Sequence, residues 1–247
     1  MLQPILTLPS GTELKGGSPG SAVKSLTLHT AVNAGQEFTI GSAFSDYIEA
    51  EIWADPGGSL QITAGDALAY YRQDDAGSRT KVGVFYAEKP TRTKRNSYKV
   101  TAYDTMSKLD ADFSGWLHSN QAQFPKTIWQ LVQLACQRAG VTLASSSLPI
   151  NGSYSVQAFY ADDLTCRQII SWAAEAAGCY AHMNADGKLQ FLTYTDKRST
   201  AKITPDGASS TAYYADSLSY EDYTVKAIEK VQIRQSDSDV GVIYPDS

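Results

Sequence analysis

The residues best suited to nucleophilic chemistry are the three cysteines and three histidines of the sequence: Cys136, Cys166, Cys179, His29, His118 and His182. Cys136 and Cys166 lie in alanine-rich patterns typical of helices, where a free cysteine behaves as a small apolar side chain. Cys179 and His182 lie three residues apart in a predicted strand, so their side chains point to opposite faces. The sequence has neither a Gly-x-Ser-x-Gly elbow nor an HExxH motif. It therefore predicts no catalytic residues of this kind.

The carboxylates are the next group that could do chemistry. Glu49 and Glu51 alternate along one face of a predicted strand, which is typical of a solvated or interface face rather than of a glycosidase acid–base pair. Asp162 and Asp163 indicate a solvated turn ahead of a helix. An acidic group near the end of the chain lacks the pattern of a Ca²⁺-binding loop: Asp216, Glu221 and Asp222. There is also no CxxC, no histidine pair and no nucleotide-binding fingerprint. We therefore expect no enzyme activity, no metal site and no cofactor.

One dense basic cluster occupies the first half of the chain: Arg79, Lys81, Lys89, Arg92, Lys94, Arg95 and Lys99. Such a cluster can bind anions or face DNA. The alternative is the solvated tip of a hairpin between two strands. The lack of interleaved aromatic residues, which would stack on bases, favours this second interpretation.

The composition is that of an ordinary globular protein. The 247 residues are 43% hydrophobic and 19% charged, with a net charge of −5 that argues weakly against a nucleic-acid-binding face. Three distant cysteines do not form a disulfide scaffold. No apolar run approaches the roughly 18 residues of a membrane span, and the first residues lack the basic region of a signal peptide. We expect synthesis in a cytosol and no association with a membrane.

The first hundred residues predict a β-sandwich or barrel. Short alternating segments separated by turns recur roughly every 8–12 residues, and the predicted strands are 4–9, 23–31, 36–41, 46–54, 60–63, 68–72, 81–88 and 98–103. Residues 14–22 indicate a loop. In the strand over 46–54, Ile48, Ala50 and Ile52 share one face. At the end of the last strand, Asp104 is predicted to begin a turn or cap a short helix.

The second half of the chain repeats one pattern. Residues 127–141 and 165–179 align without gaps, and each begins Thr-x-x-Gln, a capping box, and reaches a glycine after a run of alanines. We expect helices over about 127–140 and 165–178, each with an apolar stripe that packs inside its own domain. The stripes are Ile128, Leu131, Val132, Ala135 and Ala139, and Cys166, Ile169, Ile170, Ala173 and Ala177.

Strands are predicted after both helices. The first is over residues 141–143. The second belongs to a hairpin over 179–195 with a tight turn at Asp186-Gly187, where both central residues would have positive φ. Two further strands are expected within 227–235 and 240–244.

Several segments together resemble the hub domain of phage tail proteins. They are FTIGSAFSDYIEAEIW, ITAGDALAYY and VGVFYAEKPTRTKRNSYKVTAYDTMSKL in the first half, and LTCRQIISWAAEAAGCYAHMNADGKLQFLTY in the second. The shared features are Gly41-Ser42, Gly65, Gly83 and the strand-to-helix junction Ala102-Tyr103-Asp104. In the second half, the shared feature is a capped helix ending in Ala-Gly, followed by a strand, an Asp-Gly turn and a strand.

The resemblance implies an α+β fold, in which a β-barrel of the tube or hub type carries an inserted small α/β domain with two similar helices. It implies a first barrel domain over 1–109, the insertion over 110–199, and strands over 200–247 that complete this barrel or begin a second.

The resemblance also implies a non-enzymatic role in the virion. The expected role is a homotrimeric ring at the tail tip or baseplate hub, made in the host cytoplasm. Its partners would be the distal tail or tail tube protein, the tape measure protein, and tip or fibre proteins. No specific nucleic-acid binding is expected. Two alternatives stay open: a cell-wall carbohydrate-binding β-module that uses exposed Trp53, Trp116 and tyrosine residues for sugar stacking, and a cell-wall peptidase or muramidase.

Overall fold

The computed structural model describes residues 2–33, 39–54, 60, 62–194, 231–233 and 241–244. The chain forms two compact units, Met1–Thr195 and Asp196–Ser247. In the second unit, β13 (Val231–Ile233) and β14 (Val242–Tyr244) form an antiparallel pair, at the two places where terminal strands are predicted. The acidic residues Asp216, Glu221 and Asp222 lie outside the described residues.

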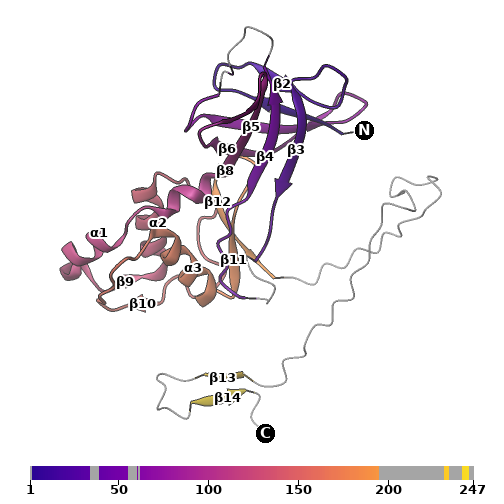
Figure 1. Ribbon diagram of the computed structural model, residues 1–247. Coiled ribbons are helices and arrows are strands. Elements are labelled where there is room, and N and C mark those ends of the chain that lie inside the picture. Colours follow the sequence, from indigo (N-terminus) through magenta and orange to yellow (C-terminus); the bar gives the residue numbers. More distant parts are fainter. Residues whose placement is uncertain are drawn as a thin grey trace, which may run out of the picture. The chain divides into compact units, whose positions relative to one another are not determined.

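The first unit contains an eight-stranded antiparallel sheet (Figure 1). Its strands are β1 (Gln3–Thr7), β2 (Glu13–Lys15), β3 (Val23–His29), β4 (Tyr47–Trp53), β5 (Ala67–Gln73), β6 (Arg79–Ala87), β7 (Thr91–Lys94) and β8 (Ser97–Asp104). They are ordered β2-β1-β5-β6-β8-β4-β3, and β7 pairs with β8. The two halves of the sheet meet where β6 pairs with β8 over Phe85, Tyr86 and Ala87.

The sheet is not closed into a barrel. Within the described residues the ladder ends at β2 on one side and at β3 on the other, although β1 and β3 approach each other. The expected α+β class and the large antiparallel sheet are therefore confirmed. Barrel closure is not confirmed, because in the described residues the end strands β2 and β3 are not hydrogen-bonded to each other.

The strand periodicity matches the burial of the sheet. Ile48, Ala50 and Ile52 of β4 are buried, as predicted, and pack with Leu68 and Val100 in one apolar core. Four local predictions are wrong. The expected loop over 14–22 begins inside β2, and β7 was missed because its sequence TRTK has no apolar residue. Residues 39–41 of the strand expected over 36–41, and residues 60, 62 and 63 of the strand expected over 60–63, are not in a strand.

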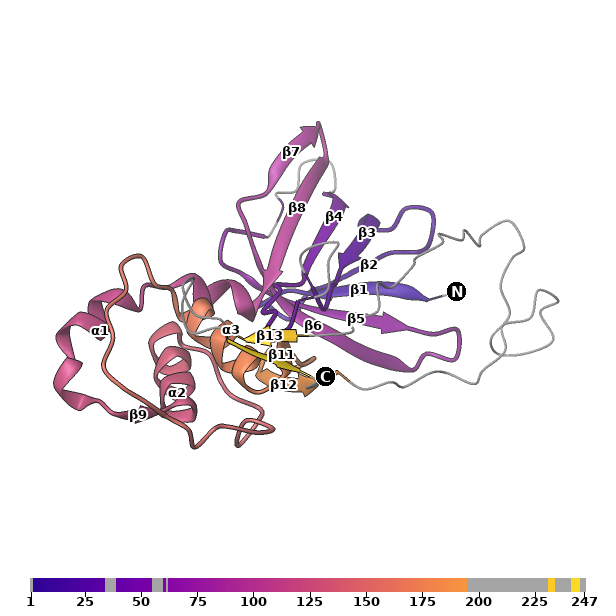
Figure 2. The same cartoon turned by 90° about the horizontal axis from the view of Figure 1, so that it is seen from below.

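The helical part begins directly at the end of β8. Its elements are η1 (Thr105–Asp110), α1 (Ser114–Ser119), η2 (Gln121–Gln123), β9 (Lys126–Thr127), α2 (Ile128–Ala139), β10 (Ser155–Val156), α3 (Cys166–Ala176), β11 (Cys179–Met183) and β12 (Leu189–Thr193). Figure 2 shows the three α-helices and the β11–β12 hairpin gathered on one side of the sheet. Both capping boxes form as predicted, at Thr127 and Thr165.

A second apolar core holds the helical part together. The two predicted helix stripes pack into it together with Met106 of η1, Phe113 and Leu189 of β12. Because η1 contributes to this core, the second core begins immediately after the last strand of the sheet. The domain limits at residues 109 and 199, and the return of 200–247 to the sheet, stay predictions.

Two details of this part differ from the expectation. Residues 141–143 form a single bridge from Leu143 to Leu189 rather than a strand. In the β11–β12 turn only Gly187 has positive φ, at 72°, and its N–H donates to the Asn184 carbonyl at 2.9 Å. A single residue with positive φ is sufficient here. The loop is longer than a two-residue hairpin turn, which would require positive φ at both of its central residues.

Gly41 lies against helix α3. It has φ of +85°, and a Cβ there would lie 2.6 Å from Glu175 Cβ and 2.8 Å from the Ser171 carbonyl. Its N–H donates to the carbonyl of Cys179 at 3.0 Å, and Ala181 N–H donates to the Ser42 carbonyl at 2.8 Å. The segment around Gly41 therefore hydrogen-bonds to the edge of β11, and position 41 has no room for a side chain.

We expect Gly41→Ala to destabilise the first unit more than Gly65→Ala, as measured by urea unfolding. Both glycines have positive φ, which costs an alanine about 1–2 kcal/mol. Only Gly41 also meets a steric overlap, which adds roughly 1–3 kcal/mol. Gly65, with nothing within 4 Å of its Cβ position, is the matched control. Equal losses in the two variants would contradict the close packing of Gly41 on α3.

Candidate functional site

A buried polar cluster lies where the sheet meets the helical part. Asp104 is the last residue of β8, Asp46 precedes β4, and His182 belongs to β11. Asp104 N–H donates to the Asp46 carbonyl at 2.8 Å, and Asp46 N–H donates to Asp104 Oδ2 at 3.2 Å. His182 Nε2 lies 3.1 Å from Asp46 Oδ2. We call these three residues the junction cluster.

Asp104 caps η1, as its position predicted. Its carboxylate accepts from Met106 N–H at 3.0 Å and from the Ser45 hydroxyl at 2.7 Å. Burial is the largest influence on this group and raises its pKa to about 6, with a smaller rise from the nearby charge of Asp46, while the donated hydrogen bonds act in the opposite direction. The carboxyl is therefore held as a structural cap in an environment that disfavours its charge.

His182 connects the β11–β12 hairpin to the sheet. The hydrogen bond and negative charge of Asp46 raise the pKa of His182, against the opposing effect of burial, and the charge of Asp104 adds a smaller rise. Asp46 Oδ2 also accepts from the Thr30 hydroxyl at 2.9 Å. The two hydroxyls beside the junction cluster, those of Ser45 and Thr30, thus each donate to one of its carboxylates. Ser45 and Thr30 thereby hold the two carboxylates in position.

The cysteines are placed as small apolar side chains. All three are free and buried, and burial raises the pKa of Cys136 to about 12 and that of Cys179 to about 11. Cys179 and His182 point to opposite faces of β11, as predicted. A thiol is nucleophilic only as the thiolate. This geometry therefore does not support a cysteine-dependent reaction.

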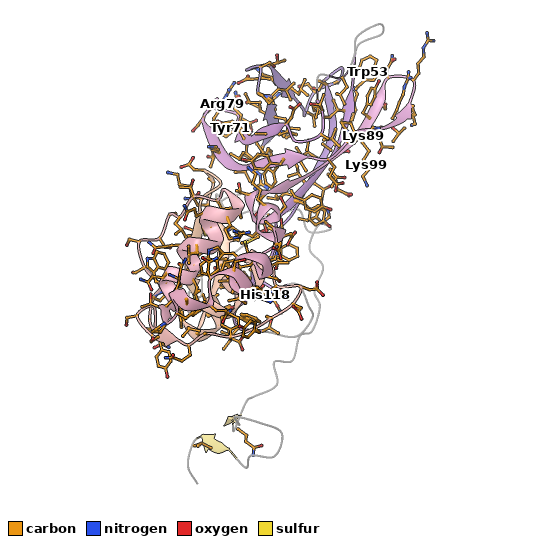
Figure 3. The ribbon with its side chains drawn as sticks, turned by 90° about the vertical axis from the view of Figure 1, so that its left-hand side faces the viewer. Trp53, Tyr71, Arg79, Lys89, Lys99 and His118 are labelled. Carbon is orange, nitrogen blue, oxygen red and sulfur yellow. The ribbon has the colours of Figure 1, made fainter. Side chains whose placement is uncertain are left out.

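The basic cluster is divided among separate places on the sheet. Arg79 pairs with Glu13, Lys81 Nζ lies 2.8 Å from Asp186 Oδ1, and Lys99 Nζ lies 2.7 Å from Glu49 Oε1. Figure 3 shows Arg79 well away from Lys89 and Lys99. The remaining members are exposed around the β7–β8 hairpin: Lys89, Arg92, Lys94 and Arg95. The structure therefore does not gather the seven cations into one surface.

Neither tryptophan considered for sugar stacking is a free platform. Lys24 Nζ lies 4.9 Å from the ring centroid of Trp53. The ring of Trp116 contacts Phe113 and Phe124 and has Lys126 Nζ at 5.9 Å. The most exposed tryptophan of the described residues is Trp172, which the sequence analysis did not single out. Its place on α3, outside the predicted core stripe, is the signal that could have found it.

Two further candidates from the sequence are placed in polar pairs, of which His118–Asp162 is exposed and His29–Glu49 is half-buried. His118 Nε2 lies 3.5 Å from Asp162 Oδ1 on the surface of the helical part, and His29 Nε2 lies 3.8 Å from Glu49 Oε2. Among the described residues, no three His, Cys, Asp or Glu side chains are placed to hold a metal ion. In the same residues, no helix is long and apolar enough to cross a bilayer.

No protein-family model and no curated protein matches the sequence. The fold is similar to the crystal structure of the 43 kDa tail protein of prophage MuSo2 from Shewanella oneidensis, with a TM-score of 0.55 and 14% sequence identity. The chain shares the fold of a prophage tail protein. The match covers 83% of this chain and 59% of the MuSo2 protein, so it spans less than two thirds of that protein.

A tail protein from Neisseria meningitidis MC58 aligns with a TM-score of 0.47 and 12% identity, over 77% of this chain and 50% of that one. At these identities the likeness is one of fold. The MuSo2 match confirms the resemblance to phage tail proteins that the sequence indicated.

We expect the thiols of the native protein to react slowly with Ellman's reagent and to react at once in urea. Burial excludes the reagent and raises the thiol pKa values, so little thiolate is exposed. Absorbance during labelling measures the rate. The same chain in urea is the control, because it shows the rate of unhindered thiols. Rapid labelling of one thiol under native conditions would contradict this prediction and would show that the protein has a reactive cysteine.

We expect the junction cluster to make the protein less stable as pH rises. Asp104 holds a proton up to about pH 6 in the folded state but only to about 3.8 when unfolded, so stability falls across that interval. The raised pKa of His182 extends the fall above pH 6.5. The free energy of unfolding of wild type minus Asp104→Asn should therefore decrease between about pH 4 and 6, by on the order of 2–3 kcal/mol.

Urea titrations at several pH values measure this difference. Asp163→Asn removes the same charge from an exposed turn and controls for net charge. His182→Gln tests the upper part of the range. Parallel pH profiles for wild type and Asp104→Asn would show that the junction cluster does not couple protonation to folding.

Proposed function

We propose that this chain is a structural component of a phage or prophage tail, placed at the tail tip or baseplate hub. The observation that carries the proposal is the shared fold with the MuSo2 tail protein over 83% of the chain. The order of segments in the sequence, from Gly41-Ser42 to the Asp186-Gly187 turn, supports the hub placement through the resemblance to hub proteins.

In this proposal three copies form a ring that joins the tail tube to the tip. The eight-stranded sheet supplies the wall of the ring, and three copies together complete barrel-like walls. Strand β4 has the required two faces, since Ile48, Ala50 and Ile52 are buried while Glu49 and Glu51 lie on the polar face. A net charge of −5 suits a tube that passes DNA without gripping it.

The partners follow from this placement. The ring would contact the distal tail or tail tube protein on one side, and tip or fibre proteins on the other. The tape measure protein would end within or against the ring. The helical part, with its own core, would lie on the outside, where it leaves the wall uninterrupted.

Chemical cross-linking at increasing protein concentration tests the ring. We expect lysine cross-linking to stop at three copies, and negative-stain images to show threefold rings, because a closed ring leaves no free interface. The same reaction in urea controls for random collisions. A ladder that continues beyond three copies, or a strict monomer at every concentration together with its absence from purified tail tips, would contradict the proposal.

A further inference from the structure

The junction between the sheet and the helical part is polar. Each part has an apolar core of its own, and among the described residues no buried side chain belongs to both cores. Figure 1 shows the two parts meeting where β8 ends beside the β11–β12 hairpin. There His182 Nε2 lies 3.1 Å from Asp46 Oδ2, and Arg167 of α3 donates to the carbonyls of Ala43 and Met106 at 3.2 and 3.1 Å. Polar contacts therefore determine how firmly the two cores are held together.

The charged side chains on the elements around the junction cluster have partners outside it. Lys81 pairs with Asp186, Arg167 pairs with Asp110, Lys99 and His29 pair with Glu49, and Lys108 lies over the ring of Tyr86. Lysine and arginine keep their charge between about pH 5 and 8, where histidine and raised carboxyl groups change theirs. Within the described part of the chain, His182 is thus the cation that pairs with the buried carboxylates of the cluster.

The loss of two protons would turn this cluster from neutral to doubly negative. When Asp104 is protonated and His182 is charged, the negative charge of Asp46 is balanced by His182. When both have lost their protons, two carboxylates that are only 9% and 4% exposed lie close together without a cation. Asp46 Oδ1 is buried and accepts no hydrogen bond from the described residues. Burial and like charge both disfavour this state.

We propose that the junction cluster is a proton-controlled hinge, which holds the helical part against the sheet while it keeps its two protons and releases it when they are lost. The cluster lies outside both apolar cores, so each core stays folded in the open form. The proposal concerns a local opening at Asp46, Asp104 and His182. It is distinct from a uniform loss of stability, and it does not depend on the ring proposed above.

The direction of the switch follows from the groups themselves. Burial raises the pKa of Asp104 to about 6, and the hydrogen bond from Asp46 raises the pKa of His182. A raised pKa in the closed form means that the closed form is favoured at low pH and loses that advantage as pH rises through the raised value. The hinge is therefore closed in mild acid and opens above neutrality.

Hydrogen exchange of the full chain, followed by NMR and corrected for the intrinsic rate, tests the hinge. The reporters are the backbone N–H groups of Asp46, Asp104 and Met106, which donate within the cluster. We expect them to be protected at about pH 5 and to exchange within about tenfold of the unprotected rate at about pH 8. The amides of the β4–β8 ladder and of α2 should stay at least about a hundredfold protected in the same sample.

Three variants separate the hinge from other effects of pH. Asp104→Asn is uncharged at every pH, so its Asp46 amide should stay at least about tenfold more protected than that of wild type at about pH 8. His182→Gln removes the cation, so its reporters should open at a lower pH than in wild type. Asp163→Asn removes the same charge from an exposed turn and should behave as wild type.

Three results would overturn the proposal. Reporters that stay protected at about pH 8 would show that the cluster holds without its protons. Reporter and ladder amides that lose protection in parallel at every pH would show a uniform loss of stability with no local opening. An equal effect of Asp163→Asn and Asp104→Asn would assign the change to net charge. If Asp104→Asn does not fold, the opening pH of His182→Gln against wild type decides the question.

Discussion

The mutual hydrogen bonding of Asp46 and Asp104 is the constraint on which the arrangement of the first unit depends. Each backbone N–H of the pair is satisfied by the other residue, at 2.8 and 3.2 Å. The same two carboxylates then fix the start of η1 and the position of His182 on β11. One buried contact thus aligns the end of β8, the beginning of β4 and the hairpin that follows α3. Removing a partner from such a network leaves a buried polar group unsatisfied, which is more costly than the loss of one hydrogen bond.

The helical part achieves its order differently. Its two long helices are specified locally, each by a Thr–Gln capping box and by an apolar stripe, and they meet in a core rich in small side chains. Because alanines let the helices approach closely, little volume is left for polar groups in that core. The surface of α3 carries the half-exposed Trp172 together with the charged residues Arg167 and Glu175.

The parts of this fold that could be predicted are those determined by near neighbours in sequence. The capping boxes at Thr127 and Thr165, the Asp104 cap and the alternation in β4 each depend on residues a few positions apart. The junction cluster could not be predicted, because Asp46 and His182 are separated by 136 positions. The strand order and β7 were equally inaccessible, since TRTK has no apolar period and is held in the sheet only by its pairing with β8. Nor could the periodicity of single strands indicate that the sheet stays open. Trp172 was missed for a different reason: the periodicity of α3 predicts which of its residues are buried, and Trp172 lies outside that buried stripe.

The short seam between β6 and β8 has a mechanical consequence. Seven pairs join β4 to β8, from Tyr47 to Trp53, whereas only the pairs of Phe85, Tyr86 and Ala87 join β6 to β8. Bending the sheet at this line strains few hydrogen bonds, so its curvature is softer there than within either half. The sheet can therefore bend along this line with the loss of fewer hydrogen bonds than within either half.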